Sequence, residues 1–401
     1  MHYQKLPLFL VAIAFGLFNM TSASGADREL ALHTFVGNDG EFPYSGLVSD
    51  SDGNLYGVTL LGGAHSGGAV FRLTPGSNGK WTETLLHSFS HGTLDQWPYG
   101  PLTFDSVGNL YGVTSFGGTH NAGTVFELIR QSDGTWKFAV LHSFNAADEG
   151  PEGAMVFDAK GNLYGTTNRY PSLGTIYKLT PMGNGKWTHT VLHTFTGGND
   201  ASPIGVVLDV KGNLYGTTDA GGDPAYQGEI FKLSPGAHGK WNETVLYQLQ
   251  QQDGRINGNV TFDAAGNLYG TAVASDNFSH NTVYRLVPGA KGQWSYEVIH
   301  TFSDTDDPHG SVSFDSNGNL IGVTDGGPYA AGTVFKLTPR AKGEWPETTL
   351  YTFKSQTDGR YPNGSLIFDG AGNLYGSTIA GGKPNGCNGQ GCGVAFKIAP
   401  R

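Results

Sequence analysis

The side chains in this sequence that could bind or react stand just before a glycine that recurs in each of seven repeated units. In chain order, this position holds Ser45, Tyr99, Glu152, Ile204, Asn257, His309 and Asn363. Aromatic rings can stack on a sugar, amides can hydrogen-bond to it, and a carboxylate with an imidazole can act as acid and base. Residues that differ between repeats are not required by the repeated fold. We therefore predict that this ring of unlike side chains forms a ligand site.

Neighbouring positions supply further aromatic and charged groups. The predicted ligand contacts are Trp97, Tyr99, Arg255, Asn257, Arg360, Tyr361 and Asn363, and the candidate acid and base are Glu152 and His309. Nearby loops could add His65, His120, Arg169, Tyr170, Tyr226, His280 and Tyr329. The sequence contains no Ser/His/Asp spacing, phosphate-binding loop or paired-glutamate motif that would identify reacting groups. Solvated loops with no special role are therefore the alternative interpretation.

One segment resembles the start of a calcium loop, because Asp50 and Asp52 alternate around a glycine turn. The acidic ligand required at the twelfth loop position is replaced by Leu61, and the other six repeats replace Asp52. An Asp-x-x-Gly-Asn sequence recurs here in every repeat, where the carboxylate can accept backbone N–H bonds inside a turn. We therefore interpret Asp50 as a turn-capping residue and predict no metal and no cofactor. Calcium is the alternative at this turn.

We predict structural roles, and not catalytic or metal-binding ones, for the repeated histidines and the two cysteines. The histidines His33, His87, His142, His193 and His300 share one position of the repeat, which two other units fill with Tyr247 and Tyr351. An aromatic body with a polar tip satisfies this position, so we predict packing. Cys387 and Cys392 are the only cysteines. In an exported protein, we expect so close a pair to form a local disulfide.

The repeat is centred on Gly-Asn-Leu-Tyr-Gly at 53–57, which returns in nearly the same form at intervals of 51 to 55 residues. This period is typical of propeller blades. The second unit contains four short β-patterned runs, at residues 102–105, 109–114, 123–128 and 136–144. No segment has the apolar spacing of an amphipathic helix. The sequence therefore predicts an all-β fold, a seven-bladed β-propeller of four-stranded antiparallel blades.

The two ends of the chain complete one blade between them. The last unit supplies three strands, and residues 30–35 match the fourth strand of the first unit at residues 85–89. We therefore predict that residues 28–401 form one propeller and that residues 28–36 supply the outer strand of its last blade. This arrangement leaves no open sheet edge between the chain ends.

Residues 1–25 have the organisation of a secretory signal peptide: a basic start, an apolar run from Leu6 to Met20 and small residues before position 26. We predict cleavage and a secreted, periplasmic or cell-envelope location, with no membrane span afterwards; a retained anchor is the alternative. The net charge of −10 and the pI near 5.7 argue against a nucleic-acid partner. We expect a monomer.

The unit Phe-Asp-x-x-Gly-Asn-Leu-Tyr-Gly-x-Thr, followed by Gly-Thr-Val-Phe-Lys-Leu-Thr-Pro, resembles the Gloeobacter/Verrucomicrobia-type tandem repeat of exported bacterial proteins. The resemblance covers residues 28–401 and implies an extracellular or envelope location without an assigned chemistry. Many members of that family carry a C-terminal sorting signal that this sequence lacks, which leaves surface anchoring open. The Asp-x-x-Gly-Asn-Leu-Tyr core is more distantly similar to streptogramin-lyase-like and NHL-type propellers, a group of binding scaffolds, lyases and hydrolases.

Three classes of function follow from these observations. The first is a binding or interaction module that recognises an extracellular carbohydrate or another envelope component at the channel mouth. The second is a polysaccharide lyase or glycoside hydrolase whose acid and base come from the ring. The third is a purely structural envelope protein. Two titratable groups converging beside a cleft would favour the enzyme.

Overall fold

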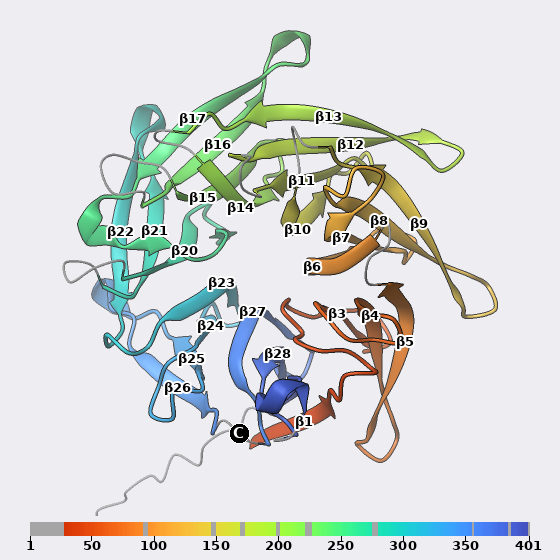
Figure 1. The fold of residues 1–401 in the computed structure, drawn as a ribbon. Coiled ribbons are helices and arrows are strands. Elements are labelled where there is room, and N and C mark those ends of the chain that lie inside the picture. Colours follow the sequence, from red (N-terminus) through yellow and green to blue (C-terminus); the bar gives the residue numbers. More distant parts are fainter. Residues whose placement is uncertain are drawn as a thin grey trace, which may run out of the picture.

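The computed structural model describes residues 28–90, 95–145, 150–168, 173–197, 201–220, 227–274, 280–354, 357–383 and 386–399. These residues form seven antiparallel sheets, which stand as blades around a central channel (Figure 1). Within each blade, the chain runs from the channel outward through paired neighbouring strands. The predicted seven-bladed propeller is confirmed. No helix among the described residues is long and apolar enough to cross a membrane.

The first four blades each consist of consecutive strands. Blades 1 and 2 comprise β2 (Val48–Ser49), β3 (Leu55–Thr59), β4 (Ser66–Pro75), β5 (Trp81–Ser90), β6 (Asp95–Phe104), β7 (Leu110–Gly117), β8 (Thr124–Arg130) and β9 (Trp136–Ser143). Blades 3 and 4 comprise β10 (Pro151–Phe157), β11 (Leu163–Thr167), β12 (Thr175–Gly183), β13 (Lys186–Thr194), β14 (Ala201–Leu208), β15 (Leu214–Ala220), β16 (Glu229–Pro235) and β17 (Trp241–Gln248).

The last three blades include one divided inner strand and the strand that closes the ring. Blade 5 comprises β18 (Arg255–Ile256), β19 (Thr261–Phe262), β20 (Leu268–Val273), β21 (Thr282–Pro288) and β22 (Trp294–Thr301). Blades 6 and 7 comprise β23 (Pro308–Phe314), β24 (Leu320–Thr324), β25 (Thr333–Leu337), β26 (Glu347–Thr352), β27 (Arg360–Phe368), β28 (Leu374–Ala380), β29 (Val394–Ala399) and β1 (Arg28–Thr34).

The N-terminal strand closes the ring, as predicted. In Figure 1, β1 lies beside the C-terminal blade, and it pairs antiparallel with β29 from Arg28↔Ala399 to Thr34↔Val394. Leu32 and Phe35 are buried in the core between blades 7 and 1. Cys392 belongs to the same core and forms the predicted disulfide with Cys387. The closing blade is therefore fixed by strand pairing, by apolar packing and by a covalent bond.

The turn between the first and second strands has the same construction in all seven blades. In blade 3, Asp158 Oδ1 accepts bonds of 2.9 Å from the N–H groups of Lys160 and Asn162. Asp158 Oδ2 accepts a 2.7 Å bond from the Asn162 side chain and a 3.1 Å bond from the Tyr164 hydroxyl. The Tyr164 ring in turn packs edge-on against Trp241 of the next blade. The motif therefore caps its own turn in every blade, and its tyrosine joins neighbouring blades except in blade 6, which has Ile321.

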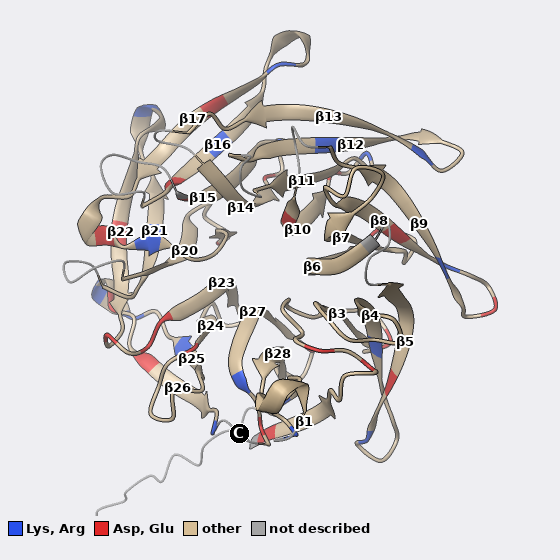
Figure 2. Cartoon of the chain, viewed as in Figure 1, with Lys and Arg blue, Asp and Glu red and all other residues tan. Residues whose placement is uncertain are grey.

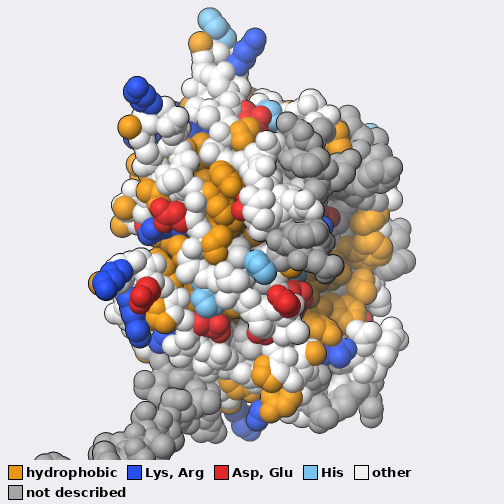
Figure 3. All heavy atoms as spheres, turned by 90° about the vertical axis from the view of Figure 1, so that its left-hand side faces the viewer, with side chains coloured by type: hydrophobic (Ala, Val, Ile, Leu, Met, Phe, Trp, Pro, Cys, Tyr) orange, Lys and Arg blue, Asp and Glu red, His pale blue; other side chains and the backbone are white. Residues whose placement is uncertain are grey.

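The repeated histidine position lies on the outer strands and makes the predicted packing contacts. His142 stacks on His189 of the next blade with ring centroids 4.1 Å apart, and His87 stacks likewise on Phe138 at 4.0 Å. His300 instead lies 3.2 Å from a carboxylate oxygen of Glu347. Figure 3 views this rim from the side of β17, β22 and β26, and apolar, acidic, basic and histidine side chains are intermixed on it.

Candidate functional site

In five blades, a proline at or just before the start of the inner strand packs on a glycine of the preceding blade. Pro98 lies so close to Gly68 that a Cβ on this glycine would stand 2.5 Å from the proline Cδ. The same contact recurs at Gly123–Pro151, Gly174–Pro203, Gly332–Pro362 and Gly393–Pro43. Because proline also fixes its own φ, the contact determines where the strand begins relative to its neighbour. It positions the residue that follows at the channel mouth.

A β-bulge comes immediately after the ring residue. The register between β10 and β11 shifts between Glu152 and Val156, and Gly153 has a φ of +82°. Corresponding shifts occur in β6, β23 and β27. In blade 5, the interruption divides the inner strand into β18 and β19. A bulge bends the strand and re-aims the side chain beside it, which accounts for the ring residues facing the cavity.

The glycines of these bulges let neighbouring inner strands approach backbone to backbone. A Cβ on Gly100 would stand 2.8 Å from the carbonyl oxygen of Gly153, and a Cβ on Gly46 would stand 2.7 Å from that of Ser365. Threonine hydroxyls fix the strands from behind: Thr166 Oγ1 donates a 3.0 Å bond to the carbonyl of Glu152. Glycine is therefore required here by close backbone approach as well as by φ.

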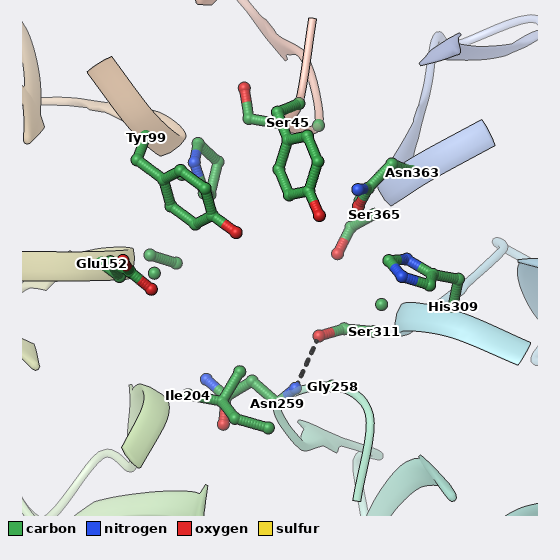
Figure 4. A pocket seen from close by; sticks show the side chains of 18 of the residues that line it. Ser45, Tyr99, Glu152, Ile204, Gly258, Asn259, His309, Ser311, Asn363 and Ser365 are labelled. Carbon is green, nitrogen blue, oxygen red and sulfur yellow. Dashed lines mark hydrogen bonds between the residues drawn. The ribbon is translucent and has the colours of Figure 1, made fainter. Parts of the chain in front are cut away.

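All seven residues of the predicted ring line one cavity of about 560 Å³ at the mouth (Figure 4). The cavity size is within the usual range for small-molecule sites. Arg255 also lines it, together with residues that the sequence did not single out: Tyr44, Asn168, Asp219, Asn259, Ser311 and Ser365. The wall also includes aliphatic residues, among them Leu47, Leu102 and Ile256, and the apolar ring member is Ile204. Figure 2 shows acidic colour on β10 beside the channel, where Glu152 is the acidic residue.

Three polar atoms of this wall have no hydrogen-bond partner among the described residues: Ser45 Oγ, His309 Nδ1 and Asn363 Nδ2. Ser45 is 3% exposed and Asn363 is 8% exposed. A buried polar group without a partner costs roughly 1–3 kcal/mol, and native proteins contain few of them. Figure 4 shows the three side chains around one side of the cavity, contributed by blades 1, 6 and 7. The wall therefore contains three polar atoms whose hydrogen bonds the described protein does not supply.

Two phenols and a carboxylate also line the cavity, and the first phenol, Tyr44, directly precedes Ser45 in the chain. The rings of Tyr44 and Tyr99 lie 5.1 Å apart at an angle of 35°. In Figure 4, the Tyr99 hydroxyl points into the cavity and Glu152 lies on the neighbouring blade. Burial, together with the nearby Tyr44 and Glu152, raises the pKa of Tyr99. Its phenol therefore stays protonated at neutral pH and can both donate and accept a hydrogen bond.

Two further carboxyl groups stand at the ends of second strands. Burial raises the pKa of Asp219, while Arg255 and a hydrogen bond from Ser202 oppose that rise. Burial also raises the pKa of Asp325, which His309 opposes. Each carboxyl therefore has a basic neighbour contributed by an inner strand.

Several predicted contacts lie elsewhere or have a structural partner. In the described part of the chain, Trp97, Arg360 and Tyr361 are not among the residues that line the cavity. Trp97 packs edge-on against Phe116 with centroids 4.5 Å apart, and the Arg360 guanidinium lies 5.1 Å from the Tyr361 ring. Asn257 lines the cavity but donates a 2.9 Å bond from Nδ2 to the Pro308 carbonyl of the next blade.

The predicted loop residues form a separate group. His65, His120, His280 and Tyr329 are exposed, and Arg169, Tyr170 and Tyr226 lie outside the described residues. The proposed acid and base do not meet, since Figure 4 places Glu152 and His309 on opposite sides of the channel. No group of three or more His, Cys, Asp or Glu residues within the described ranges is placed to hold a metal ion.

The residues that the sequence did not single out follow two recognisable patterns. Asn259, Ser311 and Ser365 stand two residues after a ring position, within the irregular segment that follows it. Asn168 and Asp219 end the second strand, where the equivalent residues of other repeats include Leu60 and Val273. Variation at these two positions was the signal that could have found them.

Comparisons with known proteins identify the repeat and the fold. The sequence pattern of the Gloeobacter/Verrucomicrobia repeat matches residues 16–171, 129–308 and 258–401. No curated protein sequence matches the chain. A solved structure of a candidate 6-phosphogluconolactonase from Bacteroides uniformis is similar with a TM-score of 0.52 and 15% identity, over 77% of this chain and 84% of that one.

A second solved structure, of a candidate oxidoreductase (glucose dehydrogenase) from Thermus thermophilus, has a TM-score of 0.44 and 16% identity, over 92% of this chain and 99% of that one. The likeness at 15% identity shows the propeller fold alone.

Proposed function

The chain belongs to the Gloeobacter/Verrucomicrobia repeat family, and from that premise we propose that it is an exported binding module whose channel mouth recognises a carbohydrate. The observation that supports this most strongly is that three residues lining one cavity, Ser45, His309 and Asn363, each contain a buried polar atom without a partner among the described residues. A polyhydroxylated ligand offers both donors and acceptors to such atoms.

The rest of the cavity is consistent with the same class of ligand. Tyr44 and Tyr99 offer aromatic surface to the faces of sugar rings, and the amides of Asn259 and Asn363 add hydrogen-bonding groups. The separation of Glu152 from His309 favours binding over an acid–base reaction that uses these two residues.

The proposal is tested with the protein lacking residues 1–25, on a glycan array and in a polysaccharide depolymerisation screen. We expect saturable binding of at least one oligosaccharide without release of shorter products. Asn363→Ala and Ser45→Ala should each weaken that binding by roughly tenfold, because a bound hydroxyl group then loses its partner. Ser106→Ala, at an exposed turn on the opposite face, is the matched control and should leave the affinity unchanged.

The absence of binding to any glycan would contradict the proposal, as would equal affinities for all three variants. Release of oligosaccharide products would favour the enzymatic alternative.

A further inference from the structure

We propose that the channel mouth binds the ends of glycan chains, so that a terminal sugar enters along the channel axis and an internal segment of a polysaccharide is excluded. This inference rests on the proposed function and names the part of a carbohydrate that the site recognises. It follows from the closed perimeter of the cavity and from its depth.

The wall of the cavity is continuous around the axis, because neighbouring blades are in contact at every boundary at the level of the ring residues. Between blades 2 and 3, a Cβ on Gly100 would stand 2.8 Å from the Gly153 carbonyl oxygen. Between blades 5 and 6, the Gly310 N–H donates a 3.0 Å bond to the Asn257 carbonyl. The other five boundaries are bridged by Gly46 with Ser365, Tyr44 with Tyr99, Gly153 with Ile204, Thr217 with Gly258, and Gly310 with Gly364. The described part of the wall therefore offers a bound chain no exit between two blades.

The cavity also extends below the ring residues. Its lining includes Val48, Leu102 and Ile367, which come later along the inner strands of blades 1, 2 and 7. Val48 and Ile367 each stand two residues before the aspartate that caps the turn at the other end of the strand. Because successive residues of a strand advance along its length, the cavity follows these inner strands from the mouth towards the turn face. The site is therefore a well along the channel axis.

The polar groups that would recognise a sugar lie within this well. Asn363 and Ser45 are buried, and Figure 4 shows the Ser365 hydroxyl pointing into the cavity, two residues further along the same strand as Asn363. A sugar that contacts Ser365 must therefore descend into the cavity. A sugar within a chain has a linkage on each side and needs two paths out of the site, whereas a terminal sugar needs only one. The closed wall and the depth thus favour the end of a chain.

The size of the cavity limits how much of the chain is held. A volume of about 560 Å³ is in the range of small-molecule sites, so the cavity encloses a short terminal segment and not a length of polymer. Binding should then depend on the number of chain ends and not on the mass of polysaccharide.

The test uses linear polysaccharides, in which the number of ends changes with chain length while the composition stays constant. Amylose, mannan, chitosan, hyaluronan and polygalacturonate are each prepared as a short and a long fraction, and their binding to the protein lacking residues 1–25 is measured by isothermal titration. We expect each polysaccharide that binds to take up one protein molecule per chain in both fractions. At equal mass, the long fraction should therefore bind less protein, in proportion to its chain length.

A pair of variants tests entry into the well. Ser365→Phe fills the cavity below the ring and should weaken binding of the short fraction by at least roughly tenfold. Ser77→Phe introduces the same side chain at the exposed turn between β4 and β5, and it should bind like the wild type. Thermal melting of both variants establishes that they are folded.

The outcomes separate the two proposals. Several protein molecules on each long chain, or equal binding of the two fractions at equal mass, would overturn the recognition of ends and leave carbohydrate binding intact. Unchanged affinity of folded Ser365→Phe for the short fraction would contradict entry of the chain into the cavity. Failure of every glycan to bind, on the array and in this panel, would remove both proposals.

Discussion

The two faces of the propeller are built from the same seven repeats but follow opposite rules. On the turn face, every blade presents Asp-x-x-Gly-Asn, and the aspartate carboxylate accepts the bonds that cap the turn, as Asp158 does from Lys160 and Asn162. On the mouth face, the ring position carries seven side chains of which only one type, asparagine, occurs twice. The turn face uses its polar groups internally, whereas Ser45 and Asn363 on the mouth face leave polar atoms without partners in the described structure.

The contrast separates residues that maintain the ring from residues that are free to serve a ligand. A side chain whose bonds are all made within its own turn contributes to stability and offers little to a partner. A buried polar side chain without a hydrogen-bond partner lowers the stability of the free protein, and a ligand that supplies the partner can restore that stability. Substitutions on the turn face should therefore lower stability and leave binding intact. Substitutions on the mouth face should lower binding and leave stability intact.

The largest effect on stability should come from removing the strand that closes the ring. Deleting residues 28–36 leaves the edge of β29 unpaired and removes Leu32 and Phe35 from the core between blades 7 and 1. The two buried side chains and the lost strand pairing together should lower the free energy of unfolding by at least about 5 kcal/mol. Guanidinium unfolding would measure this, with a truncation of residues 1–26 as the control. Melting of both truncated proteins at the same temperature would contradict closure by β1.

A change within one repeated turn should have an intermediate effect. Asp158→Ala removes the acceptor of four hydrogen bonds and should lower the free energy of unfolding by about 2 kcal/mol. Glycan binding should be unaffected once the protein is folded. Asp52→Ala is the control, because this aspartate is exposed at the same kind of turn. Equal melting temperatures for the two variants would show that the turn bonds do not stabilise the ring.

Two glutamates on outer strands, Glu29 and Glu83, should make the stability of the protein depend on pH. Burial and the nearby Asp358 raise the pKa of Glu29 from 4.5 to about 7. Burial and Asp39 raise the pKa of Glu83 to about 7 as well, against the opposing effect of His33. The folded state therefore retains these protons where the unfolded chain has released them. Their stabilising contribution is complete below about pH 4.5 and is lost as the pH rises through 7.

Glu29→Gln and Glu83→Gln should flatten this part of the melting profile. Both variants should match the wild type near pH 4.5 and melt at a higher temperature at pH 8. Glu344→Gln, at an exposed position, serves as the control and should keep the wild-type slope. A melting profile of the two variants that still falls as steeply between pH 4.5 and 7 would contradict the raised pKa values.

The smallest effect on stability should come from the mouth, and one residue type allows a matched test. Asn373 on the turn face donates a 2.6 Å bond from Nδ2 to Asp369, whereas Asn363 Nδ2 has no partner among the described residues. Asn373→Ala should therefore lower the free energy of unfolding by about 1 kcal/mol, whereas Asn363→Ala should not lower it, because it removes a buried amide group that has no partner. Differential scanning calorimetry of both variants measures this, and an equal loss would remove the distinction between the faces.

The fold could be predicted from the sequence because the repeat is regular and its strands alternate cleanly. The ring could be predicted for the same reason, since a common register identifies equivalent positions. Tyr44 was missed because the first repeat has one extra residue between Pro43 and Gly46, so that Ser45 was aligned with Tyr99. Asn168 and Asp219 were missed because a different strand carries them, and pairing with the inner strand brings them to the mouth only in three dimensions.

The backbone conformation of Trp97 and Tyr361 explains why their side chains do not line the cavity as predicted. Both precede the proline of their inner strand and have a positive φ, of +58° and +57°. This backbone conformation is uncommon for residues other than glycine, and it recurs before the same proline at Phe42, Gly150 and Ser202. Trp97 instead packs on Phe116, and Tyr361 is exposed beside Arg360.

Hydrogen–deuterium exchange with and without a bound glycan tests the division between the two faces most directly. We predict that the ligand protects backbone amides around the mouth, at residues 42–47, 95–100 and 360–365, and leaves exchange at the Asp-x-x-Gly-Asn turns unchanged. Protection at the turns, with unchanged exchange around Ser45, Tyr99 and Asn363, would contradict a ligand site at the channel mouth.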